Sequence, residues 1–362
     1  MHIELIENVA DIFWHETLNM SDDAWFWHTP LYTKFLLEVN NARSIQILSF
    51  AIIDKSKIVA VCPLYLDHVQ GKNQLGCGDE PVPFPALVNS LSPVAREKVL
   101  ECYFSEIARI AKEYQAKQIR IRISPLSRSH ISSPFRPFNP LVRYGLLDLN
   151  IATQVIDLRF DEELLWRDVR KGHRADIRNA EKICHSIFWD SETVTDEIFL
   201  RYKQMHIKDS GRVTRSDKSF KIMHEWIKNK NAILAEIKYG NLTAAFALII
   251  LFGDGAYYGS GCKDPDIYEF NASHLLQWHL IIWLKSKGLN YYDIGIQYSQ
   301  PQWAYVPSKK EINISKYKRG FGGVSVPVYS GDLFFELGAL ETAIEIRSKA
   351  LIKAYQNKFN VT

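Results

Sequence analysis

The sequence predicts a mixed α/β protein with two domains of similar design, followed by a C-terminal helix. Its 362 residues exceed the size of one ordinary domain and suit two domains that each bury a core. The same order of elements, a hairpin followed by a loop, a helix and a strand, is predicted once in each half. A stretch rich in proline and serine, residues 124–140, separates the halves. We therefore expect domains at 1–150 and 151–330 and a helical segment at 331–362.

The first half supplies a hairpin, a helix and a strand. Apolar residues in β-type patterns predict strands at 44–53 and 57–67 around a polar turn. A glycine- and proline-rich stretch follows, and apolar residues at helical spacing then predict a helix at 93–117. A further strand is expected at 118–124.

The second half repeats this order, with mixed strands around a central helix. The expected elements are strands at 232–238, 242–252 and 256–263, a helix at 273–287 and a strand at 291–294. The last segment predicts one helix at 333–356. We expect its apolar residues to pack against a domain, and a helix lying on a membrane surface is the alternative.

Composition and charge narrow the function classes. The chain is 47% hydrophobic and 23% charged with a net charge of +3, so a site for a polyanion is expected to be local rather than a broad basic surface. The five cysteines are scattered without a Cys-x-x-Cys pair, which predicts reduced thiols and supports neither a disulfide framework nor a zinc site. No basic segment followed by an apolar core begins the chain, and residues 244–252 are too few to span a bilayer. We expect a cytoplasmic protein without a transmembrane segment or a metal.

The most informative stretch is residues 290–323. It places Asp293 at the end of a predicted strand and, about two dozen residues later, Lys318 beside an aromatic residue flanked by glycines. Such glycines let the backbone approach a ligand closely, and a lysine between aromatic rings can hold its charge away from bulk water. The alternative is that Tyr317 and Phe321 are core contacts one helical turn apart, with an exposed Lys318 between them.

A second candidate is a row of basic residues on a predicted helix. Arg170, Arg174, Arg178 and Lys182 recur every four residues and would form one cationic stripe if the helix is continuous. Like charges at this spacing repel each other, which suggests an anionic partner such as a phosphate. The stripe can also be a solvated face relieved by nearby acidic residues, and Gly172 can break the helix and remove Arg170 from it.

A third candidate is the start of the helix predicted at 273–287. The run Gly259-Ser260-Gly261-Cys262 precedes it, and Asn271 or Ser273 is expected to cap it. Free N–H groups at a helix N-terminus attract anions. The residues expected to contact substrate here are Tyr257, Ser260 and Asn271.

A predicted loop at 297–310 displays aromatic residues between two prolines. Tyr298 and Trp303 are expected to stack on sugar or base rings of a ligand, although burial under the loop is an equal alternative. His206, His274 and His279 lack metal-ligand spacing, and we interpret them as structural. Cys77 has no apparent histidine and amide partners, which argues against a nucleophilic role.

Four short segments occur in a characteristic order along the chain. They are residues 166–182, residues 270–278, the Tyr-Asp-Ile-Gly at 292–295 and the Lys-Arg-Gly-Phe-Gly-Gly at 318–323. In order and spacing they resemble the Fem-type transferases, whose fold is two GCN5-related N-acetyltransferase (GNAT) modules in tandem. The resemblance is good over about residues 155–325 and weak over 40–125.

This resemblance implies a fold and roles for particular residues. The fold would be α/β with mixed sheets, as two tandem GNAT-like modules plus the C-terminal helix. Lys318 would lie near the transferred carbonyl, Asp79 would contact substrate, and basic residues near Arg174 would lie close to a substrate diphosphate. The full pyrophosphate-loop pattern of simple acyltransferases is missing, which leaves the location of the acyl donor open.

The expected function is N-acyl transfer. The reaction needs a deprotonated amine, a stabilised oxyanion and an accommodated leaving group. Lys318 would supply the positive charge, and Asp79 or Asp293 would be the base. The favoured donor is acyl-coenzyme A, acting on the amino group of a nucleotide-linked sugar for a surface polysaccharide such as lipopolysaccharide.

Two alternatives stay open. Aminoacyl-tRNA can be the donor for a peptidoglycan precursor, but gripping tRNA needs many phosphate contacts and the net charge is only +3. The chain can also be a noncatalytic binding module that kept the fold, because fold does not imply function.

Overall fold

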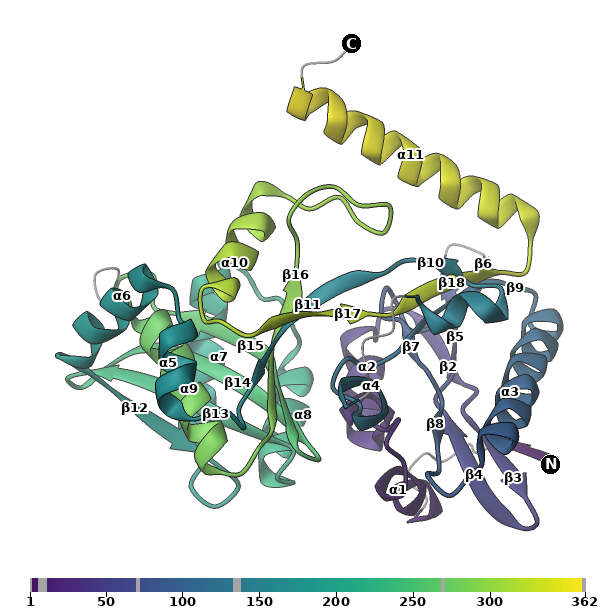
Figure 1. The fold of residues 1–362 in the computed structure, drawn as a ribbon, viewed down its shortest axis with the longest axis horizontal. Helices are drawn as coiled ribbons and strands as arrows, with labels where there is room; N and C mark the ends of the chain where they lie inside the picture. The colour runs from purple at the N-terminus through teal and green to yellow at the C-terminus, as the bar shows by residue number, and fades with distance from the viewer. Residues whose placement is uncertain (1, 6–11, 70–71, 133–137, 268–270, 360–362) are drawn as a thin grey trace. The chain divides into compact units, whose positions relative to one another are not determined.

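The structure is a computed structural model that describes the chain except residues 1, 6–11, 70–71, 133–137, 268–270 and 360–362 (Figure 1). The chain divides into two compact units. The first unit comprises Met1–Ala152, Tyr298–Ile312 and Pro327–Thr362, and the second comprises Thr153–Gln297 and Asn313–Val326. The sequence predicted two contiguous domains. In the structure, residues 298–312 and 327–362 belong to the first unit, although they follow the second unit in the chain.

The first unit contains two sheets. Their strand orders are β1-β3-β4-β8 and β10-β18-β9-β6-β5-β2, with β7 paired to β9. The strands are β1 (His2–Leu5), β2 (Ser44–Ile47), β3 (Phe50–Asp54), β4 (Lys57–Cys62), β5 (Tyr65–Val69), β6 (Lys72–Leu75), β7 (Val82–Pro83), β8 (Ala86–Leu87), β9 (Ala116–Arg122), β10 (Leu147–Asp148) and β18 (Ser330–Phe334). The helices are α1 (Ile12–Asn19), η1 (Phe26–His28), α2 (Pro30–Val39), α3 (Pro93–Glu113), α4 (Arg128–Ile131), η2 (Pro140–Tyr144) and α11 (Leu337–Phe359).

Several predicted elements of the first unit differ from the observed ones. The strand expected at 57–67 is divided into β4 and β5, which belong to different sheets, and the strand expected at 118–124 is β9, at Ala116–Arg122. The strand expected at 44–53 is divided into β2 and β3, which belong to different sheets, and the hydroxyl of Ser49 bonds the backbone of Leu64 where the chain passes between them. The helix expected at 93–117 ends at Glu113, because Gln115 takes a left-handed conformation with φ 52°. The last helix begins at Leu337 rather than 333, since the preceding residues pair with β9 as β18.

The second unit is one mixed sheet with the order β12-β13-β14-β15-β16-β11-β17. Its strands are β11 (Ile151–Asp157), β12 (Cys184–Trp189), β13 (Ala232–Tyr239), β14 (Leu242–Phe252), β15 (Gly255–Lys263), β16 (Tyr291–Gln297) and β17 (Val324–Val328). Its helices are α5 (Glu162–Asp168), α6 (Lys171–Glu181), α7 (Asp196–Ser210), α8 (Asp217–Lys228), α9 (Ala272–Ser286) and α10 (Lys309–Arg319), whose first residues belong to the first unit.

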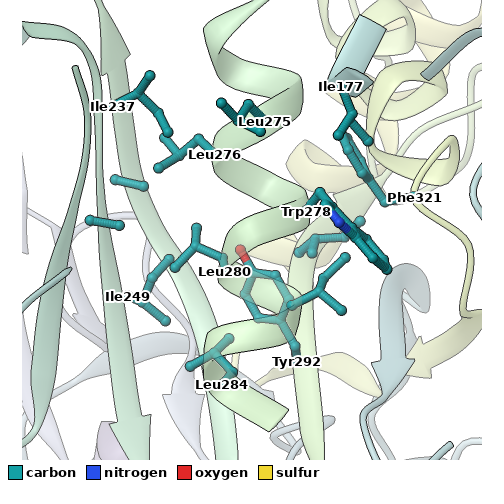
Figure 2. Close-up of a cluster of buried hydrophobic side chains, with 14 of the residues drawn as sticks. Ile177, Ile237, Ile249, Leu275, Leu276, Trp278, Leu280, Leu284, Tyr292 and Phe321 are labelled. Carbon is teal, nitrogen blue, oxygen red and sulfur yellow. The ribbon is translucent and has the colours of Figure 1, made fainter. Parts of the chain in front are cut away.

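Helix α9 is the centre of the core of the second unit (Figure 2). It is apolar around most of its circumference, which is typical of a buried helix. Leu276 and Leu280 point to the sheet, and Trp278 points to the opposite side, towards Phe321. The end of α10 is thereby fastened to the same core as the sheet.

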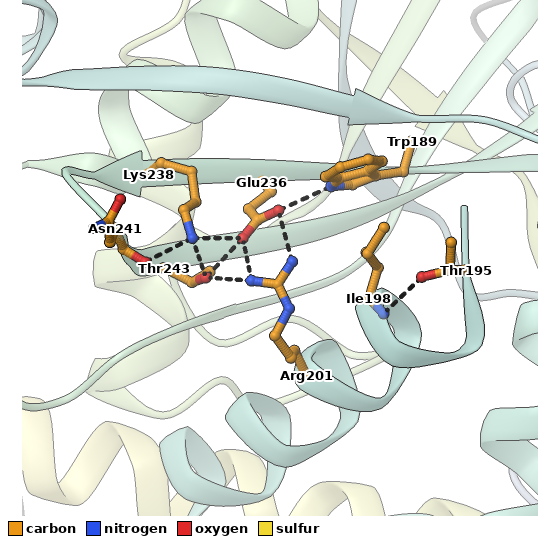
Figure 3. Close-up of polar contacts among 8 residues, drawn as sticks. All are labelled: Trp189, Thr195, Ile198, Arg201, Glu236, Lys238, Asn241 and Thr243. Atoms are coloured by element: carbon orange, nitrogen blue, oxygen red, sulfur yellow. Dashed lines mark hydrogen bonds and ion pairs between the residues drawn. The ribbon is translucent and has the colours of Figure 1, made fainter. Parts of the chain in front are cut away.

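A buried carboxylate ties the other face of the sheet to α7 (Figure 3). Glu236 of β13 is fully buried and accepts hydrogen bonds from the indole of Trp189, the hydroxyl of Thr243 and the guanidinium of Arg201. Side chains alternate across a strand, so Glu236 faces α7 while its neighbours Ala235 and Ile237 face α9. A buried charge with this many partners fixes one packing of helix on sheet.

No helix within the described part of the chain combines the length and apolarity that crossing a membrane requires.

Candidate functional site

The site is built where β15 and β16 part. These strands run parallel and pair at Gly255–Tyr291, Ala256–Tyr292 and Tyr257–Asp293 only, although both continue further. Asp293 is thus the last residue of β16 that is paired to β15. The strand itself runs on to Gln297, so Asp293 lies within β16 and not at its end, where the sequence had predicted it. Predicted substrate-binding Tyr257 is its direct partner.

Asp293 is a buried carboxylate with one satisfied oxygen. Its Oδ1 accepts hydrogen bonds from the hydroxyl of Thr153 at 2.5 Å and from the backbone N–H of Gly295 at 2.7 Å. Its Oδ2 is buried and has no hydrogen-bond partner. Burial raises the pKa of Asp293 to about 6, while the two hydrogen bonds and the charge of Lys318 oppose the rise. The carboxylate is therefore mainly ionised at neutral pH, and the nearby ammonium stabilises that charge.

Lys318 extends from the last turn of α10 and lies against β16. A Cβ built on Gly295 would be 2.5 Å from the Lys318 amino nitrogen, so the absence of a side chain there makes room for the ammonium. The nitrogen also lies 5.9 Å from the centre of the Tyr258 ring, a cation–π distance. Burial lowers the pKa of Lys318 and Asp293 opposes that change. Lys318 is not the exposed residue of the alternative interpretation, although Tyr317 and Phe321 do pack together, with ring centres 5.1 Å apart.

The start of α6 holds the segment that carries Lys318. The backbone N–H of Arg170 donates to the carbonyl of Gly320 at 2.8 Å, and Nε2 of His173 lies 2.9 Å from the carbonyl of Tyr317. A carbonyl only accepts, so Nε2 of His173 carries the proton and its Nδ1 accepts from Arg170 at 2.9 Å. A Cβ on Gly320 would stand 2.2 Å from this ring. Glycine at 320 is therefore required by the packing of His173.

Three residues here have the geometry of a metal cluster. Ligand atoms of His173, Asp176 and His274 all lie within 4.8 Å of one another. Both ring nitrogens of His173 are already hydrogen-bonded, and Oδ1 of Asp176 accepts from the side chain of Asn271 at 3.0 Å. A cation bound by His173 would have to displace the Arg170 guanidinium. The cluster instead joins the starts of α6 and α9, and burial lowers the pKa of His274 to about 4.

The cationic stripe is interrupted. The helix expected over these residues is divided into α5 and α6, and Arg170 precedes α6 as its N-cap, so it leaves the stripe. Nη1 of Arg174 donates to the carbonyls of Trp166, Arg167 and Val169 at 3.3, 2.7 and 2.7 Å, which satisfies the C-terminal end of α5. The guanidinium of Arg178 lies over the Trp166 ring at 5.4 Å and is exposed. Phosphate binding by these arginines stays a prediction.

The glycine-rich run is a strand and not a loop. Gly259 to Cys262 lie within β15, and the Tyr258 hydroxyl occupies the space where Gly261 would carry a Cβ. Ser260 is 9% exposed, which leaves little of it for a ligand. Asn271, and not Ser273, is the N-cap of α9, with a left-handed φ of 49° and its side chain bonded to Asp176. Phe270 of the same motif lies outside the described residues.

Three predicted site residues belong to the first unit. Asp79 is exposed in the turn after β6 and interacts electrostatically with Arg120. Tyr298 packs on Tyr305 with ring centres 4.9 Å apart. Trp303 lies 5.9 Å from the guanidinium of Arg347 in α11 and is 39% exposed. Within the second unit, Tyr257 pairs with Asp293 in the sheet, and Asp293 interacts electrostatically with Lys318.

Sequence reasoning missed four residues that build this arrangement. Thr153, Tyr258, Gly295 and His173 all contact the catalytic candidates or the segment that carries them. Gly295 was visible as the glycine that follows Asp293 in a predicted strand, where an isolated glycine suggests close approach of another group. The other three come from distant elements, and nothing local in the sequence marks them.

Comparison with solved structures identifies the fold. FemX is similar over 94% of this chain and 99% of its own length, with a TM-score of 0.64 and 12% identity. L-PGS from Bacillus licheniformis matches over 96% and 98%, with a TM-score of 0.55 and 11% identity. The C-terminal domain of a putative lysylphosphatidylglycerol synthetase from Agrobacterium fabrum matches over 88% and 92%, with a TM-score of 0.53 and 14% identity.

A scan of protein-family models and a search of curated proteins give no match. The likeness to FemX confirms the predicted fold class, a mixed α/β chain of two GNAT-like modules in the Fem-type arrangement.

Proposed function

We propose that this chain is an acyltransferase in which an amine attacks an activated acyl carbonyl beside Lys318. The observation that carries the proposal is a half-buried ammonium that lies against Gly295 and the Tyr258 ring and interacts electrostatically with Asp293, at the point where β15 and β16 part. A preorganised cation in a partly desolvated position is what a developing oxyanion or leaving group requires. The Fem-type fold, which is shared with transferases, supports the same conclusion.

The chemistry needs few protein groups. The amine nitrogen forms a bond to the carbonyl carbon, and the π electrons move to the oxygen as a tetrahedral oxyanion forms. The oxyanion then collapses, the bond to the donor sulfur or oxygen breaks, and the amine proton passes to a base. Lys318 stabilises the oxyanion or the departing thiolate or alkoxide by its charge.

Asp293 acts through Lys318 in this proposal. Its free oxygen is buried in the protein, so the carboxylate favours the charged form of the lysine rather than taking the proton of an incoming amine. Asp293 is thus a positioning residue. Asp79 remains the candidate base from the sequence, and its exposure is compatible with contact to a substrate.

Our first choice of donor is acyl-coenzyme A, with the amino group of a nucleotide-linked sugar as acceptor in the cytoplasm. A net charge of +3 suits a ligand with two or three phosphates better than a whole tRNA. Aminoacyl transfer is the second candidate, and the likeness to FemX and to a lysylphosphatidylglycerol synthetase domain favours it. Its donor would be aminoacyl-tRNA and its acceptor a peptidoglycan precursor.

An assay with a panel of both classes of acyl donor separates these two choices. Purified protein is incubated with acyl-coenzyme A and a nucleotide-linked amino sugar, and released thiol is followed with a disulfide dye, with the Lys318→Met protein as control. Thiol release that depends on Lys318 supports the first choice. Absence of thiol release across the panel, together with transfer from charged tRNA to a muropeptide, supports the second.

Absence of transfer from both classes of donor would contradict the enzymatic proposal and favour the interpretation of the chain as a noncatalytic binding module. Thermal shift then identifies the ligand, since a ligand at a hundred times its dissociation constant adds about 2.7 kcal/mol to stability.

A further inference from the structure

A pocket of about 410 Å³ opens in the second unit next to the segment that carries Lys318. Its buried walls are apolar and come from Val155, Leu165 and Phe321. Two lining residues are large, apolar and exposed: Phe160 is 51% exposed and Val324 is 65% exposed. Small-molecule sites have volumes and apolar linings of this kind.

The charged groups of the lining differ in whether they have partners. Asp157 is held by Arg159 in a two-bond ion pair. Asp168 accepts the backbone N–H of Gly323 at 2.7 Å. Arg167 is exposed, and its guanidinium has no hydrogen-bond or ion-pair partner in the described parts of the chain. Arg167 is therefore the one cationic side chain among these lining residues, and it lies beside the exposed carboxylate of Asp168.

We propose that this pocket binds a single aliphatic chain with an anionic headgroup, the chain lying along Val155, Leu165 and Phe321 and the headgroup meeting Arg167. Burying a methylene chain against these walls releases water from both surfaces. An arginine without a counter-ion prefers a carboxylate or phosphate, which its planar fork binds through two hydrogen bonds. Binding of such a ligand does not depend on acyl transfer, so the site goes beyond the proposed function.

The pocket shares its wall with the candidate site. Gly322 and Gly323 pack closely against β11 and α5. A Cβ on Gly322 would stand 2.4 Å from Oδ2 of Asp168, and a Cβ on Gly323 would stand 2.3 Å from the carbonyl oxygen of Val155. The backbone between Phe321 and Val324 is thus fixed against β11 and α5, and a ligand in the pocket would contact the segment that leads back to Lys318.

A homologous series of alkyl carboxylates from butanoate to decanoate tests the proposal, with binding to the full chain measured by NMR titration. Each added methylene should tighten binding about fourfold until the walls are covered. Octyl phosphate should bind as octanoate does, whereas octyltrimethylammonium should bind at least tenfold more weakly. Affinity that does not depend on chain length, or equal affinity for the cationic and anionic amphiphiles, would overturn the proposal.

Variants locate the site. Val324→Asp places a charge at an exposed lining position, and Leu164→Trp fills the pocket from α5; each should abolish octanoate binding. The matched control is Val213→Asp, since Val213 is a 67% exposed valine of the same unit and does not line the pocket. Equal loss of binding in Val213→Asp, or retained binding in Leu164→Trp, contradicts the assignment.

Arg167→Gln tests the headgroup. It should weaken octanoate at least tenfold and leave octyltrimethylammonium unchanged, whereas Lys221→Gln, a change at an exposed lysine of α8, should alter neither. Unchanged octanoate affinity in Arg167→Gln would remove the anionic headgroup from the proposal.

Discussion

The amino group of Lys318 occupies the space that a side chain at residue 295 would fill. The distance from its nitrogen to a Cβ built on Gly295 would be 2.5 Å, well inside any ordinary contact. Gly295 also has a φ of 102°, a conformation that residues with a side chain rarely adopt. The glycine therefore allows both this backbone conformation and the position of the lysine charge.

Gly295→Ala should lower turnover at least tenfold, because the new methyl group displaces the ammonium from its position near Asp293 and Tyr258. Steady-state kinetics with the best donor measures this effect. Gly172→Ala is the matched control, since nothing lies within 4 Å of a Cβ there. The control should retain turnover and gain about 0.5 to 1 kcal/mol of stability, because alanine favours a helix. Full activity in Gly295→Ala would show that Lys318 acts from elsewhere.

Lys318→Met should lower turnover roughly a hundredfold or more, since a preorganised donor at such a position contributes about 3 to 4 kcal/mol to transition-state stabilisation. The Michaelis constant should change far less than kcat, because the interaction is made mainly in the transition state. Arg319→Met is the internal control: Arg319 points to the side-chain oxygen of Gln297, at 3.0 Å, and should matter less. Near-normal turnover in Lys318→Met, or a greater loss of turnover in Arg319→Met, would show that the catalytic role does not belong to Lys318.

Asp293→Asn should remove a pH dependence of folding. The pKa of Asp293 is raised from 3.8 to about 6 by burial, so its contribution to stability is full below pH 3.8 and is lost as the pH rises through 6. Between pH 5 and 7.5 the wild type should therefore lose about 1.4 kcal/mol that the variant does not lose. Urea unfolding of both proteins at the two pH values measures this difference.

The control for this experiment is Asp157→Asn. Arg159 holds the pKa of Asp157 below its usual value, so that carboxylate is ionised at both pH values and its replacement should shift stability equally. A difference between wild type and Asp293→Asn that is the same at pH 5 and 7.5 would contradict the buried, half-satisfied state assigned to Asp293.

Arg174→Gln and Arg178→Gln should differ in their effect on the free energy of unfolding. The hydrogen bonds from Arg174 to three carbonyls at the end of α5 predict a loss of about 1.5 to 3 kcal/mol of unfolding free energy, as expected for a charged donor. Arg178 is exposed over Trp166, and its replacement should change stability little. Denaturant unfolding compares the two.

If the predicted phosphate contact exists, both changes also raise the Michaelis constant, and the wild-type constant increases with salt. Kinetics that are unchanged in Arg178→Gln at low salt would make the remaining stripe a solvated face.

The sequence by itself determined the repeated central elements and their order, but not helices α1, α2, α7, α8 and α10. Apolar periodicity predicted a repeated hairpin, helix and strand, and four short motifs in order predicted the Fem-type fold. Asp293 and Lys318 were recognisable from local patterns. Asp293 lies in a predicted strand shortly before a glycine, and Lys318 lies between aromatic residues before two glycines. Local periodicity and turn chemistry are properties of neighbouring residues, so a single sequence displays them.

Tertiary structure decided which residues meet. His173 is 144 positions from the Tyr317 carbonyl that it binds, and Thr153 is 140 positions from Asp293. Where the predicted helix is divided, the backbone N–H of Arg170 donates to Gly320, and in β15 the Tyr258 side chain covers Gly261. Contacts of this kind arise only when distant segments share a core, since their energies depend on burial and partners that no short stretch of sequence contains.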